Sequence, residues 1–457
     1  MKVYKFGGAS VKSADGVKTL LEIIGSEKSK LVVVVSAMGK TTNMLEEVVN
    51  SYFNCKPDLA QNVQIVKDFH KNLVNELFCH CGLAPQSLES CCHSDESQNR
   101  FCLQTIAGQA HNDNAKQTIT TSNAVTGLDE IFSRLDEILS QKPSLSYDFE
   151  YDRIVSFGEI LSTFIVSDYL NSQGCKNQFI DVRTCLKSDD NYREGNIDFE
   201  LSQQFVSNVL NFSDTQLYIT QGFIAGTTTN QTTTLGREGS DYSAALLASM
   251  LDAESVTIWK DVSGVMNADP KRYSDVQIIP RLSYKEAIEL SYCGASVIHP
   301  KTVKPLKNKK IPLYVKSFIE PQKEGSVINE FKEKVEMPPI YINKTNQVLL
   351  SLTPRDFSFI AEERLSSIFS LLAHYKVKVS IIQSSAISFS LCIDYNAMIF
   401  PSMIKELQDE YEVKYNTDVE LITIRHYSKE IIDKLINRKD VVLEQRERVT
   451  ARFVLQG

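Results

Sequence analysis

The stretch Thr232–Pro270 limits the possible folds more than any other part of the chain. It contains the run Gly236-Arg237-Glu238-Gly239, after which Ser240-Asp241 opens an Ala/Leu-rich segment. Serine and aspartate both cap helix N-termini, so a helix is predicted to begin at this point. Ser255–Trp259 is predicted to be a buried strand because it is short, apolar and β-branched. A glycine turn, a helix and a buried strand in this order favour an α/β protein with a parallel sheet.

The same stretch has the chemistry of a phosphate site. The first N–H groups of a helix have no intrahelical acceptor, the helix dipole is positive at this end, and glycine lets an anion approach the backbone. The strand that follows ends on Lys260-Asp261. Open α/β sheets bind their ligands at the carboxyl ends of the strands, so we predict a nucleotide site at this edge.

The N-terminus offers a second phosphate-binding motif. Lys2–Phe6 has the alternation of a short strand, and Gly7-Gly8-Ala9-Ser10 turns it into a helical segment. Lys5 lies two residues before the first glycine, where its ammonium could neutralise phosphoryl oxygens while the turn donates N–H groups. Alone, Lys-x-Gly-Gly is weak evidence. The chain has no GxxxxGK[ST] string and no GxGxxG after a strand, which argues against P-loop and dinucleotide-binding folds.

Composition indicates a globular enzyme with no nucleic acid and no membrane as partner. The 457 residues suffice for two or three domains, and 42% hydrophobic with 23% charged residues is ordinary globular usage. A net charge of −8 disfavours nucleic acid and anionic membranes. The longest strongly apolar run, Leu31–Val35, is too short to span a bilayer, so we expect a cytoplasmic protein.

The ten cysteines are not expected to bind metal. Cys79-His80-Cys81, Cys91-Cys92-His93 and Cys102 form the densest group, but their spacing matches no common zinc pattern. Reduced, scattered thiols in a cytosolic protein are the preferred interpretation, and no metal is expected from the protein alone.

The alternation of strands and helices divides the chain. Strands and helices alternate from Lys2 to about Asn50, and residues 51–150 are predicted to be a helical lobe because stretches such as Val63–Leu77 and Leu128–Leu139 have helical spacing. Alternation then resumes, with Pro312–Lys316 as the last strand of a catalytic domain at 1–320. A Pro/Lys/Glu-rich linker is predicted at 321–340, before a different module at 341–457. Segments from Gln347 to Glu410 follow the order βαββα.

Taken together, these motifs resemble the aspartokinases of the amino acid kinase family. The matching strings occur in the family's order between Met1 and about Glu320; they are KFGGAS at Lys5–Ser10, VVVSAMGKTTN at Val33–Asn43, SFGE at Ser156–Glu159, ITQGFIA at Ile219–Ala225, TTLGREGSDYSAALLA at Thr233–Ala248, WKDVSGV…ADP at Trp259–Pro270, and GASVIHP at Gly294–Pro300. The resemblance implies an α/β fold with an open, mostly parallel sheet sandwiched by helices. It also implies a helical lobe and a C-terminal α+β ACT-like domain of order βαββαβ, with a truncated second copy.

The resemblance implies a monofunctional aspartate kinase that uses ATP with Mg²⁺ to phosphorylate the β-carboxylate of L-aspartate, and that assembles as a homodimer or larger. The β-carboxylate has an ordinary pKa of about 3.9, so no general base is needed. The obstacle is repulsion between anions, which cations and N–H groups must screen.

The resemblance also assigns the site residues. Lys5 and Asp241 are the expected catalytic pair. Arg237 would hold the substrate's α-carboxylate in a bidentate fork, and Glu159 its α-ammonium. The remaining substrate contacts are expected from Ser36, Thr42, Phe223, Gly239 and Ser240. The ATP side is expected to comprise Lys5, Gly7, Gly8, Ser10, Lys260, Asp261, Met266, Lys271 and Ser296.

Each residue also has a structural interpretation. Arg237 and Asp241 could form a solvated turn and a helix cap, Glu159 could be an exposed helix-start carboxylate, and the diglycine could serve packing alone. The joint occurrence of seven ordered strings favours the site. His299 is interpreted as structural.

Three residues depart from the family's pattern: Ser296 replaces a lysine, Met266 a tyrosine and Glu238 a glycine. Another amino acid kinase and a catalytically inactive amino-acid sensor therefore stay open as alternatives.

For the effector, the resemblance points to Ser380, Gln383 and Ser384. Ser380 and Ala386 carry no charge to pair with a lysine ammonium, so threonine is expected to be a likelier effector than lysine.

Overall fold

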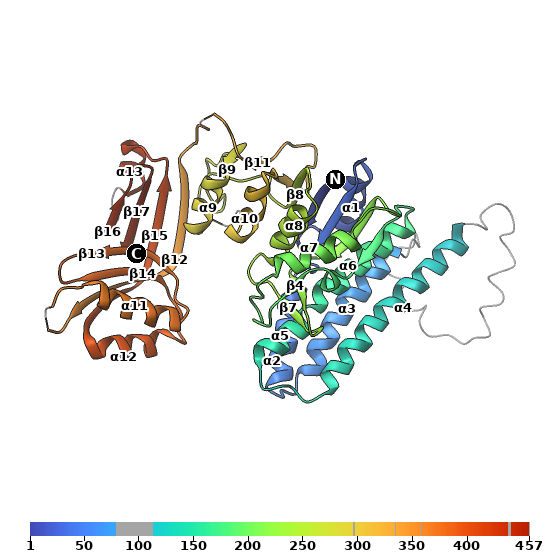
Figure 1. Cartoon of the computed structure of the whole chain (residues 1–457), viewed down its shortest axis with the longest axis horizontal. Helices are drawn as coiled ribbons and strands as arrows, with labels where there is room; N and C mark the ends of the chain where they lie inside the picture. The colour runs from blue at the N-terminus through green and yellow to red at the C-terminus, as the bar shows by residue number, and fades with distance from the viewer. Residues whose placement is uncertain (79–112, 296–297, 334, 357, 437–439, 457) are drawn as a thin grey trace. The chain divides into compact units, whose positions relative to one another are not determined.

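The computed structural model describes residues 1–78, 113–295, 298–333, 335–356, 358–436 and 440–456, of which 113–124 are described by their backbone alone (Figure 1). The chain divides into two compact units. The first consists of Met1–Gly264 with Ile298–Glu330, and the second of Val265–Val297 with Phe331–Gly457. The Cys/His-rich segment from Cys79 to Cys102 lies outside the described residues.

The first unit is built on a parallel sheet. Its strands follow the order β3-β5-β2-β1-β8-β10-β11. All neighbours are parallel except β11, which is antiparallel to β10. The strands are β1 (Lys2–Phe6), β2 (Leu31–Val35), β3 (Gln178–Ile180), β5 (Leu217–Gln221), β8 (Ser255–Lys260), β10 (Leu313–Ser317) and β11 (Ser326–Asn329). β2 and β5 are buried throughout, as expected for strands covered on both faces.

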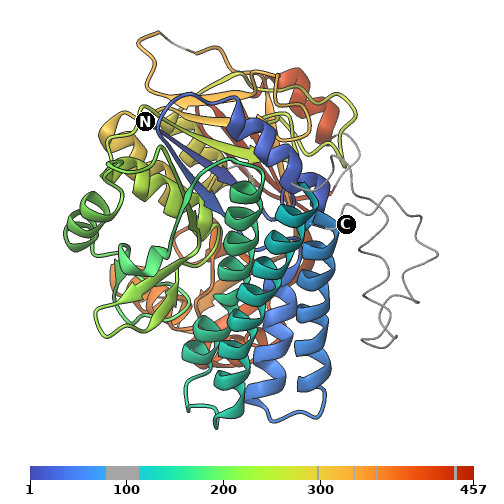
Figure 2. The same ribbon diagram turned by 90° about the vertical axis from the view of Figure 1, so that its right-hand side faces the viewer.

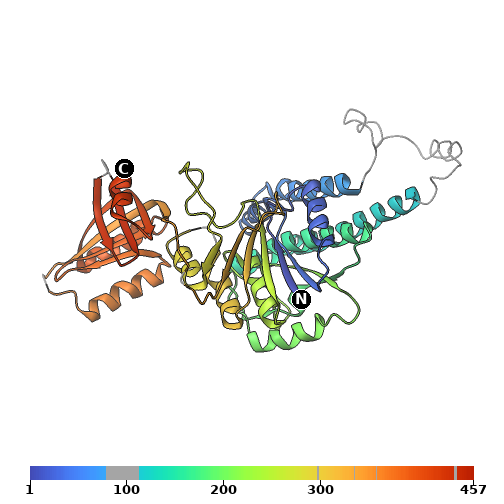
Figure 3. The same cartoon turned by 90° about the horizontal axis from the view of Figure 1, so that it is seen from above.

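Helices cover both faces of this sheet (Figure 3). Helix α8 (Gly239–Met250) contacts β1, β2 and β8, and also packs on α10 (Pro300–Lys309). Helix α6 (Phe157–Ser172) packs on β2, β3 and β5. Helices α1 (Ala14–Gly25) and α7 (Phe199–Val209) complete the layers. This arrangement confirms the predicted fold class.

Long helices run side by side between the second and third strands of the chain (Figure 2). They are α2 (Thr41–Phe53), α3 (Leu59–Phe78), α4 (Asp113–Ser140) and α5 (Tyr147–Val155). In α3, Val63, Val66, Leu73, Val74 and Leu77 are buried, which is the spacing of one apolar helix face. The predicted helices at Val63–Leu77 and Leu128–Leu139 are therefore confirmed.

The second unit contains an antiparallel sheet of order β13-β14-β12-β15-β17-β16. Its strands β12 (Ile340–Pro354) and β15 (Tyr411–Arg425) are 15 residues long and run through both halves of the sheet. The other elements of this sheet region are α11 (Glu362–His374), β13 (Val379–Ser384), β14 (Phe389–Asp394), α12 (Phe400–Glu410), α13 (Lys429–Ile436), β16 (Asp440–Arg446) and β17 (Thr450–Gln456). One half has the order βαββαβ, from the end of β12 to the start of β15.

The structure corrects the sequence interpretation in two places. Pro312–Lys316 is not the last strand of the first sheet, because β11 follows it and pairs with β10. β11 lies within the stretch 321–340, which is predicted from its composition to be a linker. β11 has four residues, too few for alternation to be recognised. The second half of the C-terminal sheet, predicted to be a truncated copy, contains four strand segments. These are the start of β12, the end of β15, and the whole of β16 and β17. The partner strands are far apart in the chain, which local patterns do not reveal.

A cluster of charged side chains joins α9 (Tyr284–Tyr292) to β15 within the second unit. Arg425 Nε and Nη2 donate to Glu286 at 2.7 and 3.0 Å, and Nη1 donates to Glu289 at 3.3 Å. Nη1 also donates to Thr450 Oγ1 at 2.9 Å, and His426 Nε2 lies 3.0 Å from Glu286 Oε1. Burial acts to raise the pKa of Glu286, but hydrogen bonds from His426 and Arg425 outweigh it and lower that pKa to about 2. The cluster thus fixes a helix from the middle of the chain against a strand near its end.

Among the residues that the structure describes, no helix is long and apolar enough to cross a membrane.

We expect Arg425→Met to lower the free energy of unfolding of the second unit by about 3 kcal/mol, because two carboxylates lose their buried partner. Urea denaturation followed by hydrogen exchange of β15 amides measures the change. Lys414→Met is the matched control, since Lys414 pairs with Glu412 at 3.0 Å with both side chains more than half exposed. Equal stability of the two variants would contradict a structural role for the cluster.

Candidate active site

A buried carboxylate between two lysines forms the centre of the site. Asp241 lies in the first turn of α8, and Lys5 Nζ lies 2.7 Å from its Oδ1. Lys260 Nζ lies 3.6 Å from Oδ2. β1 and β8 are parallel neighbours with Lys5 opposite Ile258, so Lys260, two residues on, faces the same side. Strand register thus brings together two residues that are 255 positions apart.

The two lysines keep Asp241 ionised. Its side chain is only 3% exposed. Burial acts to raise the pKa of Asp241, and the charges of Lys5 and Lys260 outweigh it, so this pKa lies below its ordinary value. Two cations around one carboxylate leave a net positive charge at the carboxyl edge of the sheet, which suits an anionic ligand.

The diglycine turn after β1 packs against the turn after β2. Gly39 N–H donates to the Gly8 carbonyl at 2.9 Å, and Ser36 N–H donates to the Phe6 carbonyl at 3.1 Å. A Cβ on Gly8 would lie 2.4 Å from the Ala37 carbonyl oxygen, so only glycine fits there. Gly7 has more room, since its Cβ would meet its nearest neighbour, Lys5 Nζ, at 3.7 Å. Close packing of the backbone therefore requires glycine at Gly8 and not at Gly7.

Glu159 lies in the first turn of α6 and is buried, not exposed. Its side chain accepts a hydrogen bond from Ala37 N–H at 3.2 Å, while Oε2 has no hydrogen-bond partner among the described residues. Burial raises the pKa of Glu159 to about 8, against the smaller lowering effects of the Ala37 N–H group and the Lys5 charge. A buried carboxylate with one free oxygen is suited to receive a cationic group of a ligand.

The loop before α8 presents Arg237 to solvent. Gly236 and Glu238 on either side have positive φ angles of 74° and 54°. Arg237 is exposed and forms no ion pair with any residue that the structure describes. Glu238, the departure from the family's glycine, accepts a hydrogen bond from His299 N–H at 2.9 Å through Oε2. His299 Nδ1 in turn accepts from Lys301 N–H at 3.2 Å and caps α10, in agreement with its structural interpretation.

The turn after β5 packs on the start of α8. Phe223 has a φ of 67°, and its N–H group donates to Ser243 Oγ at 3.0 Å. A Cβ on Gly239 would lie 2.7 Å from the Phe223 ring, and one on Gly222 would lie 2.5 Å from Ser240 Cβ. Phe223, Gly239 and Ser240, three of the predicted substrate contacts, therefore lie close together.

Asp152, which the sequence analysis missed, anchors the hairpin that leads to Arg237. The hairpin consists of β6 (Ile224–Thr227) and β7 (Thr232–Thr234), paired with β4 (Lys187–Ser188). Asp152 on α5 is fully buried and accepts hydrogen bonds from Thr234 N–H and Oγ1 at 2.8 and 2.6 Å. It also accepts one from Arg193 N–H at 2.8 Å. Its main partners are backbone groups, which leave no sequence signal.

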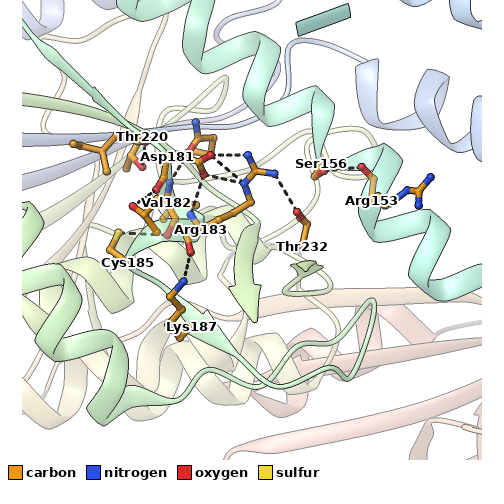
Figure 4. Close-up of polar contacts among 12 residues, drawn as sticks. Arg153, Ser156, Asp181, Val182, Arg183, Cys185, Lys187, Thr220 and Thr232 are labelled. Atoms are coloured by element: carbon orange, nitrogen blue, oxygen red, sulfur yellow. Dashed lines mark hydrogen bonds and ion pairs between the residues drawn. The ribbon is translucent and has the colours of Figure 1, made fainter. Parts of the chain in front are cut away.

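An ion pair also holds the start of β7. Figure 4 shows Asp181 and Arg183 facing each other, with Thr232 of β7 beside the guanidinium group. Arg183 Nη2 donates to Asp181 Oδ2 at 2.6 Å and Nε donates to Oδ1 at 2.9 Å. Nη1 donates to Thr232 Oγ1 at 3.1 Å. The 3₁₀ turn η2 (Val182–Thr184) is thereby tied to β7.

The other predicted site residues fall into several groups. Ser36 and Thr42 are half-buried after β2 and in α2, and Ser10 Oγ donates to the Trp259 carbonyl at 3.5 Å. Asp261 is exposed directly after β8. Met266 and Lys271 belong to the second unit, and Ser296 lies outside the described residues. The predicted effector residues Ser380, Gln383 and Ser384 lie on β13 of the second unit.

Comparison with known proteins decides the family. The model of the amino acid kinase family matches residues 1–317. The chain belongs to this family. It is 30% identical over 334 residues to the bifunctional aspartokinase/homoserine dehydrogenase of Buchnera aphidicola subsp. Acyrthosiphon pisum (strain APS), covering 72% of its own length and 36% of the relative's.

Other relatives extend the similarity over most of the chain. It is 28% identical over 442 residues to the lysine-sensitive aspartokinase 3 of Escherichia coli (strain K12), which is 92% of this chain and 86% of the relative. Its fold is similar to that of E. coli aspartokinase III in complex with aspartate and ADP, with a TM-score of 0.75, 24% identity and coverage of 100% and 96% of the two chains. The predicted resemblance to aspartokinases is therefore confirmed.

The two glycines of the turn after β1 provide a matched test of its geometry. We expect Gly8→Ala to lower the free energy of unfolding by about 1–3 kcal/mol, because its Cβ would overlap a backbone oxygen. Gly7→Ala should change it by less than about 1 kcal/mol. Thermal unfolding of both variants measures the difference. Equal effects would show that the two turns do not pack as described.

Proposed function

We propose that this protein is an aspartate kinase that transfers the γ-phosphoryl group of ATP to the β-carboxylate of L-aspartate. The product is 4-phospho-L-aspartate, at the first step toward lysine, threonine and methionine. The observation that carries the proposal is the Lys5–Asp241–Lys260 cluster at the edge of the sheet, in the same unit as buried Glu159 and unpaired Arg237. Aspartokinases with similar sequences support the choice of aspartate over other amino acids.

The site addresses repulsion between two anions. The substrate carboxylate is already ionised, so the protein has to hold it in line with the triphosphate and screen the charge. Lys5, oriented by Asp241, would contact the transferring phosphoryl group. The N–H groups of the Gly7-Gly8 turn and of the α8 N-terminus would hold the other phosphate oxygens. Lys260 would add charge on the nucleotide side.

Arg237 and Glu159 would recognise the free amino acid. The guanidinium group of Arg237 can bind the α-carboxylate with two hydrogen bonds. The unpaired Glu159 oxygen can accept from the α-ammonium once Glu159 is ionised. This pair of opposite charges would select an amino acid over a simple dicarboxylate.

Mg²⁺ would enter with ATP. It takes many of its ligands from phosphate oxygens and water, and it neutralises charge that develops on the triphosphate. Within the described part of the chain, no group of three His, Cys, Asp or Glu side chains could hold a metal. Carriage of the ion on the nucleotide fits this arrangement.

Release of ADP from Mg·ATP in the presence of aspartate tests the proposed function. We expect aspartate-dependent release, no release with glutamate or acetylglutamate, and an aspartate KM at least about tenfold higher in Arg237→Ala with little change for ATP. Lys309→Ala is the control, since Lys309 is half-exposed on α10 and pairs with Asp252. Nucleotide binding without ADP release would favour an inactive sensor. Release with another amino acid would favour a different kinase.

The pH dependence of aspartate binding tests Glu159. Only the ionised form can pair with the α-ammonium, so the aspartate KM should fall about tenfold per pH unit up to a pH of about 8 and level off above it. Glu159→Gln should remove this slope and raise KM at high pH. The KM for ATP serves as the control.

The pH dependence of the free energy of unfolding tests Glu159 in the absence of substrate. The pKa of Glu159 is raised from 4.5 to about 8, so its contribution to stability is present below 4.5 and lost as pH rises through 8. Glu159→Gln should therefore gain stability relative to the wild type across this range. A parallel pH profile of the two proteins would rule out a raised pKa.

We also propose that lysine is not the effector of the second unit. Lys344 Nζ donates to Ser380 Oγ at 3.1 Å and lies 3.8 Å from Asp394 Oδ1. A cation of the chain itself therefore adjoins Ser380, one of the predicted effector residues, and it would repel the ammonium of a lysine side chain. The side chain of threonine carries a hydroxyl and no charge, so it is compatible with Lys344 and Ser380. The exposed edge strand β13 would also suit pairing of two chains into a homodimer.

Titration of both amino acids into the ADP-release assay tests the effector. We expect no inhibition by millimolar lysine and, if an effector acts at this site, inhibition by threonine. Lys344→Met should then admit lysine more readily. Strong inhibition of the wild type by lysine alone would contradict the proposal.

A further inference from the structure

A cavity of about 460 Å³ lies on the face of the first sheet opposite to Lys5. Alternate residues of three adjacent strands form its floor: Tyr4 is opposite Thr257, and Thr257 is opposite Tyr314. Helix α1 forms one wall. The lining residues are Lys2, Tyr4, Glu22, Ile23, Ser26, Ser255, Thr257, Trp259, Tyr314, Lys316, Pro321 and Gln322. Its volume is within the range of small-molecule sites.

Trp259 is held rigidly in the floor of the cavity. Its ring stacks on Phe6 with centroids 6.1 Å apart and an interplanar angle of 6°. Tyr4 meets it edge to face at 5.8 Å. The side chain is 4% exposed, and Nε1 has no hydrogen-bond partner among the described residues. Trp259 is therefore a fixed aromatic part of the cavity lining.

The charged side chains that line the cavity favour a ligand with a single negative charge. Lys2 Nζ is neutralised by Glu27 at 2.9 Å, and Tyr4 Oη donates to the same carboxylate at 2.6 Å. Lys316 Nζ lies 5.6 Å from the centre of the Trp259 ring and forms no ion pair within the described part of the chain. Glu22 is exposed at the rim, which disfavours a multiply charged anion.

We infer that this cavity is a second ligand site, and that it binds a small monocarboxylate with a planar apolar body. Lys316 would pair with the carboxylate. The aromatic rings of Tyr4, Trp259 and Tyr314, which line the cavity, would contact its flat body.

The cavity and the proposed kinase site lie on opposite faces of strand β8. Along β8, the Trp259 side chain faces the cavity, and the next residue, Lys260, faces Asp241 on the opposite side. The Trp259 carbonyl also accepts from Ser10 Oγ after the diglycine turn. A ligand in the cavity would thus bind a strand that ends in the kinase site, although its binding does not depend on the proposed function.

Trp259 is the single tryptophan of the chain, so its fluorescence reports directly on the cavity. We expect benzoate to change the emission of the full-length protein saturably, with half-saturation below about 1 mM, in the absence of ATP and aspartate. Benzamide and benzylamine have the same ring without the negative charge and should produce no saturable change. Free N-acetyltryptophanamide corrects for collisional quenching.

Two variants test the residues. Lys316→Met should weaken benzoate binding at least about tenfold, because it loses a charge-assisted hydrogen bond. Lys309→Met, at an exposed lysine outside the cavity, should bind as the wild type does. Ser26→Tyr, at an exposed residue of the rim, should also weaken binding by narrowing the entrance and provides a second test if Lys316→Met does not fold.

Three outcomes would overturn the inference: no saturable change with benzoate up to about 20 mM, equal changes with all three ring compounds, or unaltered benzoate affinity in both folded variants. Because no turnover is measured, a protein without aspartate kinase activity can still pass this test, and an active kinase can fail it.

Discussion

The ion pair between Lys5 and Asp241 is the interaction on which the site depends. It joins the first strand to a helix that begins more than two hundred residues later, and both side chains are almost completely buried. Burial of a lone charge is costly, and a buried pair is tolerated only where its geometry is good and further charges or hydrogen bonds assist. Lys260 supplies that assistance from the neighbouring strand. Any displacement of β1, β8 or α8 therefore leaves an uncompensated charge in the interior, which links the arrangement of these elements to the electrostatics of the site.

Close approaches of backbone make this geometry possible. The turn after β1 lies against the turn after β2, and the turn after β5 lies against the start of α8. Each contact occurs at a glycine where a methyl group would overlap its neighbour. The polar groups that follow the neighbouring strands β5, β2 and β1 consequently lie at one edge of the sheet. The β6–β7 hairpin adds Arg237 to this edge and is held through β7, by Asp152 at Thr234 and by the Asp181–Arg183 pair at Thr232.

The sequence predicts those parts of the site that follow from strand register and helix capping. Lys5, Asp241 and Lys260 belong to this group, because each occurs at a recognisable strand end or helix start. Asp152 could not be predicted, because its partners are backbone N–H groups whose positions depend on tertiary folding. The contacts of Arg425 also depend on tertiary folding, because its acceptors on α9 lie about 140 residues earlier in the chain. For the same reason, the sequence does not show that α9 belongs to the second unit. Short strands such as β11 were missed because four residues carry too little periodicity.

The two long strands of the second unit determine how this unit can unfold. β12 and β15 each contribute one end to each half of the six-stranded sheet, so neither half has a complete set of strands of its own. A domain made of separate modules could lose one and keep the other, whereas here the loss of one half removes the pairing partners of the other. The irregular register between Lys344 and Leu349 lies between the two sets of pairs. The halves should therefore melt as one cooperative body, in which a disturbance at either end of β12 is felt along its whole length.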